Sequence, residues 1–308
     1  MKRNDTLFLF LFFVFATACL TSCKDFEGDQ TVPAYIRIDT IGLACDYYTY
    51  GANTHRFVDA CLYIDEDPKG TFELPATIPV LEQGPHNVKV YGGIALNGIK
   101  NARVEYPFTA PAIFNNVDLV PDSIVTLTPI VNYWPLGENI HISWMEDFDK
   151  GTISMETTSQ SDVPMIRTSG PMAWHDPEGV HSTYSAKFVL NSDTAQFFFA
   201  NTEEITDINN VYQCILEMDY KCSDTCCVGL YYMLNYTMSQ EPLVRLRPTC
   251  ASGEDPVEWR KIYINLTPYV QEYKDADYFK LYLSSWNSRN NGEQSFYFDN
   301  LKIIYYDR

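Results

Sequence analysis

Positive charge is scarce in this sequence. The chain of 308 residues holds 22 Lys and Arg against 40 Asp and Glu, which gives a formal net charge of −18 and a pI near 4.5. A nucleic-acid-binding protein needs a basic surface that neutralises phosphates, so the composition predicts no basic patch and no nucleic-acid partner. The same acidity predicts that the folded body does not lie flat on anionic lipid.

The motifs that identify common enzyme classes are also missing. The sequence contains no Gly-x-Ser-x-Gly elbow, no His-Glu-x-x-His helix, no Walker loop and no dinucleotide glycine fingerprint. The nearest pair of histidines, His175 and His181, has no candidate nucleophile beside it. A glycosidase needs only two facing carboxylates, and 40 acidic residues leave that alternative open. We expect a protein that is not an enzyme.

The only long apolar run lies at the N-terminus. Lys2 and Arg3 precede an almost unbroken apolar segment over residues 7–20, which is typical of a secretory signal peptide. No later run approaches the ~20 residues of a membrane-spanning helix. The segment Leu20-Thr21-Ser22-Cys23 resembles the bacterial lipobox, which implies that Cys23 is acylated after removal of residues 1–22. The alternative is an ordinary signal peptide that happens to contain Cys19 and Cys23.

The lipobox resemblance implies an address for the protein. Acyl chains on Cys23 would anchor the mature chain to a bilayer. Residues 23–33 form an acidic tether, in which Lys24-Asp25-Phe26-Glu27 partly resembles the surface-export signal of Bacteroidetes lipoproteins. We therefore expect a lipid-anchored outer-membrane protein on the cell surface, with the periplasmic side as the alternative.

Short strands separated by turns dominate residues 34–132. Apolar and polar residues alternate in Tyr35-Ile36-Arg37-Ile38, and Asn97-Gly98 is a strong hairpin turn. The pattern predicts an Ig-like β-sandwich, followed by a linker over residues 133–143. Residues 63–90, which end in His86-Asn87-Val88-Lys89-Val90, resemble PEGA-type modules.

Residues 144–308 predict a second sandwich. Seven strands are expected, over residues 184–190, 196–200, 211–220, 228–234, 260–266, 279–283 and 296–306. The segments Glu146-Asp147-Phe148-Asp149, Trp259-Arg260-Lys261-Ile262 and Phe298-Asp299-Asn300-Leu301-Lys302 occur in that order. They resemble the jelly-roll domains of the carbohydrate-binding-module type on Bacteroidetes surface lipoproteins. The predicted fold class is all-β, with an N-terminal Ig-like sandwich and a C-terminal jelly roll in tandem.

The jelly-roll resemblance implies, beyond the fold, that a glycan is the ligand. Sugar recognition uses an exposed aromatic face flanked by planar hydrogen-bonding groups. Trp286, Asn287 and Arg289 supply these in one loop, and Trp174 is a second candidate. The alternative is that these aromatic rings fold back onto the sandwich. The rival function is that of an accessory subunit of an outer-membrane protein complex, which binds protein and not sugar.

A structural Ca²⁺ ion is a further expectation from the jelly-roll resemblance. It would be held by Glu146 and Asp147 at the first strand and by Asp299 at the last, since Ca²⁺ prefers oxygen ligands. The alternative is that Asp299 caps a turn or accepts from backbone amides while Glu146 and Asp147 remain solvated. Seven cysteines follow Cys23 in the mature chain, and the sequence leaves open whether they form disulfides or remain buried thiols.

Overall fold

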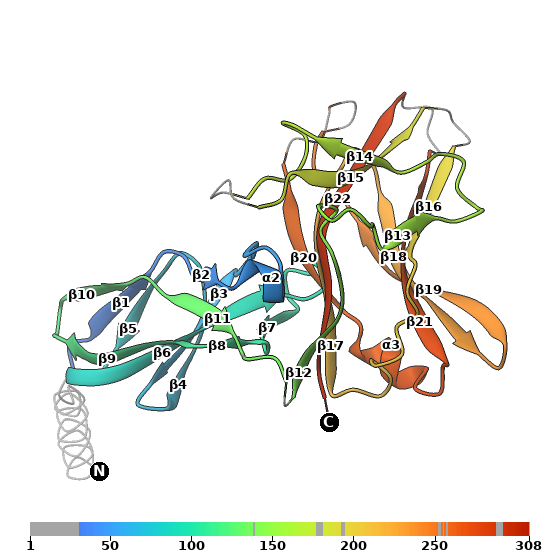
Figure 1. Ribbon diagram of the computed structural model, residues 1–308. Helices are drawn as coiled ribbons and strands as arrows, with labels where there is room; N and C mark the ends of the chain where they lie inside the picture. The colour runs from blue at the N-terminus through green and yellow to red at the C-terminus, as the bar shows by residue number, and fades with distance from the viewer. Residues whose placement is uncertain are drawn as a thin grey trace, which may run out of the picture.

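The computed structural model describes residues 31–137, 139–176, 181–191, 195–251, 254, 256, 258–287 and 292–307. Nearly all regular structure in these segments is β-strand, which confirms the predicted all-β class. Figure 1 shows two β units side by side, the first in blue to green and the second in green to red. Cys23, most of the predicted tether and Arg289 lie outside the described residues.

The first unit packs two layers of strands around one core. One layer consists of the sheets β10-β1-β5 and β2-β11-β8, and the other is β4-β3-β6-β7 with β9 also paired to β6. The bounds are β1 Ala34–Ile38, β2 Gly42–Ala44, β3 Asp59–Ile64, β4 Asp67–Glu73, β5 Ala76–Val80, β6 Gly84–Ala95, β7 Arg103–Glu105, β8 Thr109–Ala110, β9 Ala112–Leu119, β10 Ile124–Leu127 and β11 Ile130–Tyr133. A short helix, α2 (Tyr47–Tyr50), follows β2.

The second unit is a sandwich of two antiparallel sheets. The first sheet has the order β14-β15-β22-β17-β20, with β12 also paired to β22, and the second has the order β13-β16-β21-β18-β19. The bounds are β12 Ile140–Glu146, β13 Met155–Thr157, β14 Ile166–Ser169, β15 Tyr184–Leu190, β16 Gln196–Asn201, β17 Gln213–Cys222, β18 Cys226–Leu234, β19 Thr237–Leu246, β20 Arg260–Asn265, α3 Thr267–Glu272, β21 Tyr278–Trp286 and β22 Gln294–Tyr306. Strand β12 thus begins inside the predicted linker.

A β-bulge sits in the middle of β22. Glu217 of β17 pairs with Lys302, but Asp219 pairs with Asp299, so β22 carries one extra residue there. The backbone of Asn300 takes a φ of +49°, a left-handed conformation that Asn tolerates better than most residues. The extra residue reverses the alternation, so that Phe298 before the bulge and Leu301 after it both face the core.

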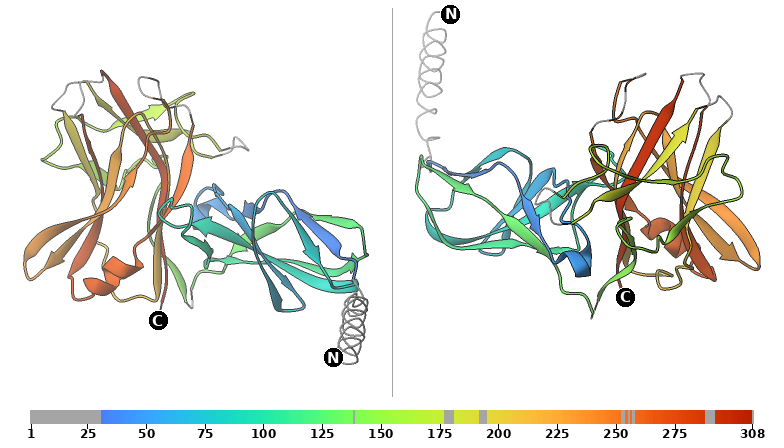
Figure 2. Two further views of the ribbon diagram at one scale, coloured as in Figure 1. Left: turned by 180° about the vertical axis from the view of Figure 1, so that it is seen from behind. Right: turned by 45° about the horizontal axis from the view of Figure 1, so that its top comes forward.

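The two faces of the sandwich meet different environments. The outer side of the β22 sheet packs on the first unit, and its Ile215, Tyr263 and Ile304 belong to the same apolar cluster as the core of that unit. Among the described residues, no residue of the first unit packs on the outer side of the β13-β16-β21-β18-β19 sheet. Figure 2 shows this sheet on the side of the second unit that points away from the first. We call it the open face.

The turn after β6 fixes the contact between the units. Leu96 forms a parallel bridge to Tyr263 in the edge strand β20, and the Asn97 backbone N–H donates to the Tyr263 carbonyl at 2.7 Å. Gly98 has a φ of +66°, and a Cβ at this position would lie 3.4 Å from the Ile262 Cδ1, so the position suits glycine. The turn therefore covers part of a sheet edge that would otherwise be unpaired. No helix among the described residues is long and apolar enough to cross a membrane.

Candidate ligand-binding face

Aromatic and polar side chains alternate with buried ones along the strands of the open face. In β21, Phe279, Leu281 and Leu283 point into the core, whereas Lys280 and Trp286 lie on the other side of the strand. Tyr231 of β18 is directly opposite Lys280 in the strand register. The two-residue alternation in the sequence therefore determines which side chains lie on the open face.

A cleft of about 470 Å³ crosses this face. We call it the tyrosine cleft, because Tyr231 lies in its floor. Its lining is Glu156, Thr158, Ser159, Gln160, Ala200, Asn201, Tyr231, Met238, Ser239, Gln240 and Lys280. The residues come from all five strands of the sheet or from the loop after β13. Such a mixture of an aromatic ring with amide, hydroxyl and charged groups suits a polar ligand with apolar patches.

Contacts beneath the tyrosine cleft fix the ring of Tyr231. The Tyr282 ring packs against it with 4.7 Å between centroids, and the Tyr231 hydroxyl donates to Gln160 Oε1 at 3.4 Å. Gly229 lies directly under Tyr282, where any Cβ would overlap the tyrosine ring. Burial raises the pKa of the Tyr231 hydroxyl, so it remains a neutral hydrogen-bonding group.

The predicted sugar-binding residues have different fates. Trp286 is 51% exposed at the end of β21, on the same face as Lys280 and the tyrosine cleft. Asn287 is only 2% exposed and donates to the Gly292 carbonyl at 3.2 Å, so its side chain stabilises the backbone at Gly292. Trp174 is 8% exposed, which matches the alternative in which the ring folds back onto the sandwich. No sequence pattern marks Gln160 or Gln240, which reach the cleft from separate elements.

The predicted calcium ligands are engaged in hydrogen bonds. Both oxygens of Glu146 accept, from the backbone N–H of Phe148 at 2.7 Å and from Ser154. Asp147 accepts from the Tyr47 hydroxyl at 3.0 Å across the contact between the units. These carboxylates are buried and not solvated. Among the described residues, no group of three His, Cys, Asp or Glu side chains is arranged to hold a metal ion.

Asp299 is completely buried at the bulge of β22. Its carboxylate accepts from the Ser185 hydroxyl at 2.5 Å and from the backbone N–H of Asn300 at 2.7 Å. Burial raises the pKa of Asp299 well above its usual range, with the neighbouring carboxylates of Asp219 and Asp149 adding to the shift. Asp299 thus holds the bulge in shape, as the backbone-amide alternative predicted.

Most of the mature cysteines are thiols. Those at Cys45, Cys61, Cys214, Cys222, Cys226 and Cys227 form no disulfide. Cys222 and Cys226 lie in the core, and burial raises the pKa of the Cys222 thiol to about 12. A thiol with so high a pKa is a poor nucleophile and a poor metal ligand at neutral pH.

Glu217 lies at the centre of a buried polar network between the units. Its carboxylate accepts from the hydroxyls of Tyr106 and Tyr133, the latter at 2.9 Å, both of which belong to the first unit. The ammonium groups of Lys261 and Lys302 approach to 3.2 Å and 3.5 Å. Burial alone would raise the pKa of Glu217, but these cations and hydroxyls outweigh it and hold the pKa below its usual range.

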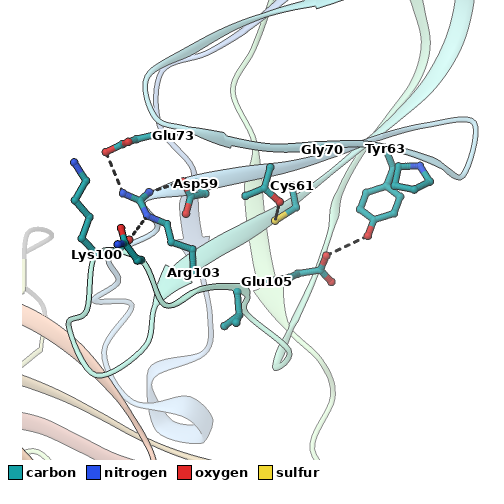
Figure 3. A pocket seen from close by; sticks show the side chains of 12 residues that line it. Asp59, Cys61, Tyr63, Gly70, Glu73, Lys100, Arg103 and Glu105 are labelled. Carbon is teal, nitrogen blue, oxygen red and sulfur yellow. Dashed lines mark hydrogen bonds and ion pairs between the residues drawn. The ribbon is translucent and has the colours of Figure 1, made fainter.

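A hollow of about 610 Å³ in the first unit has charged walls (Figure 3). The Arg103 guanidinium donates to Asp59 at 2.5 Å and to Glu73 at 3.1 Å. Tyr63 donates to Glu105 at 3.4 Å on the opposite wall. The charge of the Arg103 guanidinium is thus already neutralised by two carboxylates of the protein. Arg103 therefore has little positive charge left to attract an anionic ligand.

The predicted absence of a basic patch is wrong. A cleft of about 700 Å³ at the contact between the units is lined by the cationic residues Arg56, Lys100, Arg245, Arg247, Arg260 and Lys261. These come from four separate stretches of the chain, so no cluster of positive charge is visible in the sequence. We call this the arginine cleft. The predicted absence of a nucleic-acid partner stays a prediction.

Comparisons with known proteins identify no family. No family model matches the chain, and neither does any curated protein. Among solved structures, the K3 cleaved adhesin domain of Lys-gingipain from Porphyromonas gingivalis is 13% identical over 54% of this chain and 98% of that one, with a TM-score of 0.34. A family 11 carbohydrate-binding module from Clostridium thermocellum, in complex with a mixed-linked tetrasaccharide, is 11% identical over 54% and 96%, with a TM-score of 0.35. These identities and TM-scores are too low to transfer a ligand from those proteins to this chain.

Proposed function

We propose that this protein is a non-catalytic, lipid-anchored outer-membrane protein whose second unit binds a glycan on its open face. The observation that carries the proposal is the tyrosine cleft on the one sheet face that the first unit leaves uncovered. A binding module must present its ligand site to solvent while the rest of the sandwich is held in place. The packing of the first unit on the opposite sheet meets both needs.

The chemistry of the open face suits a neutral sugar chain. Pyranose rings have apolar C–H faces that pack on aromatic rings, and hydroxyls that pair with amides and carboxylates. Tyr231 supplies a ring, while Gln160, Gln240 and Glu156 are exposed around it. Trp286 lies six residues along β21 from Lys280, or ~20 Å at the usual rise of a strand. A ligand that contacts both aromatic rings is therefore an oligosaccharide.

Affinity electrophoresis against a panel of neutral polysaccharides tests the glycan proposal. Tyr231→Ala and Trp286→Ala should each abolish retardation, because each removes a stacking surface. Trp134→Ala is the matched control, since Trp134 is 40% exposed in the first unit, away from the open face. No retardation of the intact protein by any polysaccharide would overturn the proposal. In that case, co-purification with a stoichiometric membrane partner would favour the accessory-subunit role.

The proposed anchor has its own test. The mature chain would be tethered only through Cys23, as the lipobox resemblance implies. Cys23→Ser should therefore prevent incorporation of labelled palmitate and release the protein from membranes. Labelling that persists in this variant would contradict the anchor.

A further inference from the structure

The arginine cleft lies where three parts of the protein meet. The edge strands β19 and β20 belong to opposite sheets of the second unit and form two of its walls. The turn after β6 and the segment before β3 close it from the first unit. Arg245 and Arg247 come from β19 and its end, Arg260 from β20, and Arg56 and Lys100 from the first unit. The cleft exists only when both units are in contact.

Five of the six cations in this cleft have no carboxylate partner among the described residues. Arg37, Lys69, Lys89 and Arg103 each form an ion pair with a nearby carboxylate. Within the part of the chain that the structure describes, no residue lining the arginine cleft is an Asp or a Glu. Lys261 is buried and paired with Glu217, but the other five cations form no ion pair with a described carboxylate.

This arrangement is unusual in so acidic a chain. Acidic residues outnumber basic ones by 40 to 22, and the tyrosine cleft and the hollow beside Arg103 both have carboxylates in their lining. Holding five like charges in one cleft is unfavourable, because their mutual repulsion grows as the surroundings exclude water. An anion placed between them would remove that cost. Guanidinium groups also offer paired N–H donors that match the two oxygens of a carboxylate or sulfate.

We propose that the arginine cleft binds the charged groups of an acidic oligosaccharide, at a site separate from the tyrosine cleft. Leu243, Val244 and Tyr220 also line the cleft and supply apolar surface for the sugar rings between the charges. The volume of about 700 Å³ holds a short segment of such a chain. A long polyanion such as nucleic acid would meet the repulsion of a protein with a net charge of −18 on either side of the cleft.

Titration calorimetry of the intact two-unit protein tests this proposal. The probes are a short oligogalacturonate, which carries carboxylates, a sulfated oligosaccharide, a neutral galactose oligomer of the same length and a short single-stranded DNA. The double variant R56Q/R247Q removes one cation from each unit. Both side chains are exposed. Arg56 and Arg247 hydrogen-bond to other described residues through backbone atoms only, so the fold should persist.

The wild type should bind one or both acidic sugars, and any binding of the neutral oligomer at the tyrosine cleft should be unchanged in R56Q/R247Q. The double variant should bind on the order of 100-fold more weakly, since each lost charge-assisted hydrogen bond accounts for about a tenfold change. The control R37Q/K274Q removes the same charge from exposed positions elsewhere and should bind like the wild type. R56K/R247K keeps the charge but loses the paired donors, and its affinity should fall between the two.

Three results would overturn the proposal. One is that neither acidic sugar binds the wild type. Another is that R56Q/R247Q binds as tightly as R37Q/K274Q, which would place the anion elsewhere. The third is that the DNA binds more tightly than both acidic sugars and loses affinity in R56Q/R247Q, which would assign the cleft to nucleic acid. Tyr231→Ala should leave acidic-sugar binding intact, which keeps this site distinguishable from the tyrosine cleft.

Discussion

Replacing Glu217 by Gln should lower the free energy of unfolding and uncouple the unfolding of the two units. The buried network contains two carboxylates, Glu217 and Asp219, and two ammonium groups, Lys261 and Lys302. Their charges balance in the wild type. Glu217→Gln leaves one net positive charge in a site where every member is at most 7% exposed.

The size of the effect follows from that imbalance. Removing one partner of a buried ion pair costs about 3–5 kcal/mol, because the remaining charge stays desolvated. Gln keeps a carbonyl that can still accept from Tyr106 or Tyr133, so the loss is of charge more than of shape. The double variant E217Q/K302M restores neutrality between Asp219 and Lys261. It should therefore be more stable than E217Q alone.

Urea unfolding followed by Trp and Tyr fluorescence measures these differences. Glu203→Gln is the control, because Glu203 is exposed and forms no ion pair with any described residue. We expect E217Q to lower the free energy of unfolding by several kcal/mol and to separate the transitions of the two units. The reasoning is refuted if E217Q unfolds like Glu203→Gln, or if E217Q/K302M is less stable than E217Q.

Two further predictions concern the second unit. Burial raises the pKa of Asp299 in the fold well above that of an Asp in the unfolded chain, so above pH ~4 the folded state binds more protons and wild-type stability falls as pH rises. Asp299→Asn should therefore gain stability over the wild type as the pH rises above about 4, as measured by urea unfolding. Parallel pH profiles, or a wild type stabilised by added Ca²⁺ and a variant that is not, would instead favour a metal site. Gly229→Ala should cost about 1–3 kcal/mol by forcing the Tyr282 ring out of place, and it should also weaken glycan binding at Tyr231. Thermal unfolding scans of both glycine variants measure this difference. Gly151→Ala, where a Cβ has open space, should unfold like the wild type.

Much of the strand pattern could be predicted from the sequence. The expected strands over residues 184–190 and 260–266 match β15 and β20 to within one residue. Alternation gave these strands because one side of each faces a core. Strand β14 was missed, since Ile166–Ser169 is short and has no buried residue. Strand β19 was missed because its long run of exposed and half-exposed residues at a sheet edge carries a weak apolar signal.

The candidate site was predictable only in part. Trp286 was predicted because an aromatic ring beside Asn287 and Arg289 suits sugar recognition, although it is the last residue of β21 and not part of the loop. Trp174 has the same residue type but is covered by packing from its own loop, which composition does not reveal. Tyr231 and Gln160 are 71 positions apart and meet through the pairing of strands within one sheet. Sequence reasoning about single loops cannot find such a pair.

By itself, the sequence determined that this protein is all-β, because a two-residue apolar period and frequent turn residues leave no room for long helices. It also determined the overall acidity, which depends only on counting charges. Only the tertiary structure decided which sheet face stays open, because that depends on where the first unit packs. It also brought five unpaired cations into one cleft, since charges far apart in the chain become neighbours only when strands β19 and β20 meet the turn after β6.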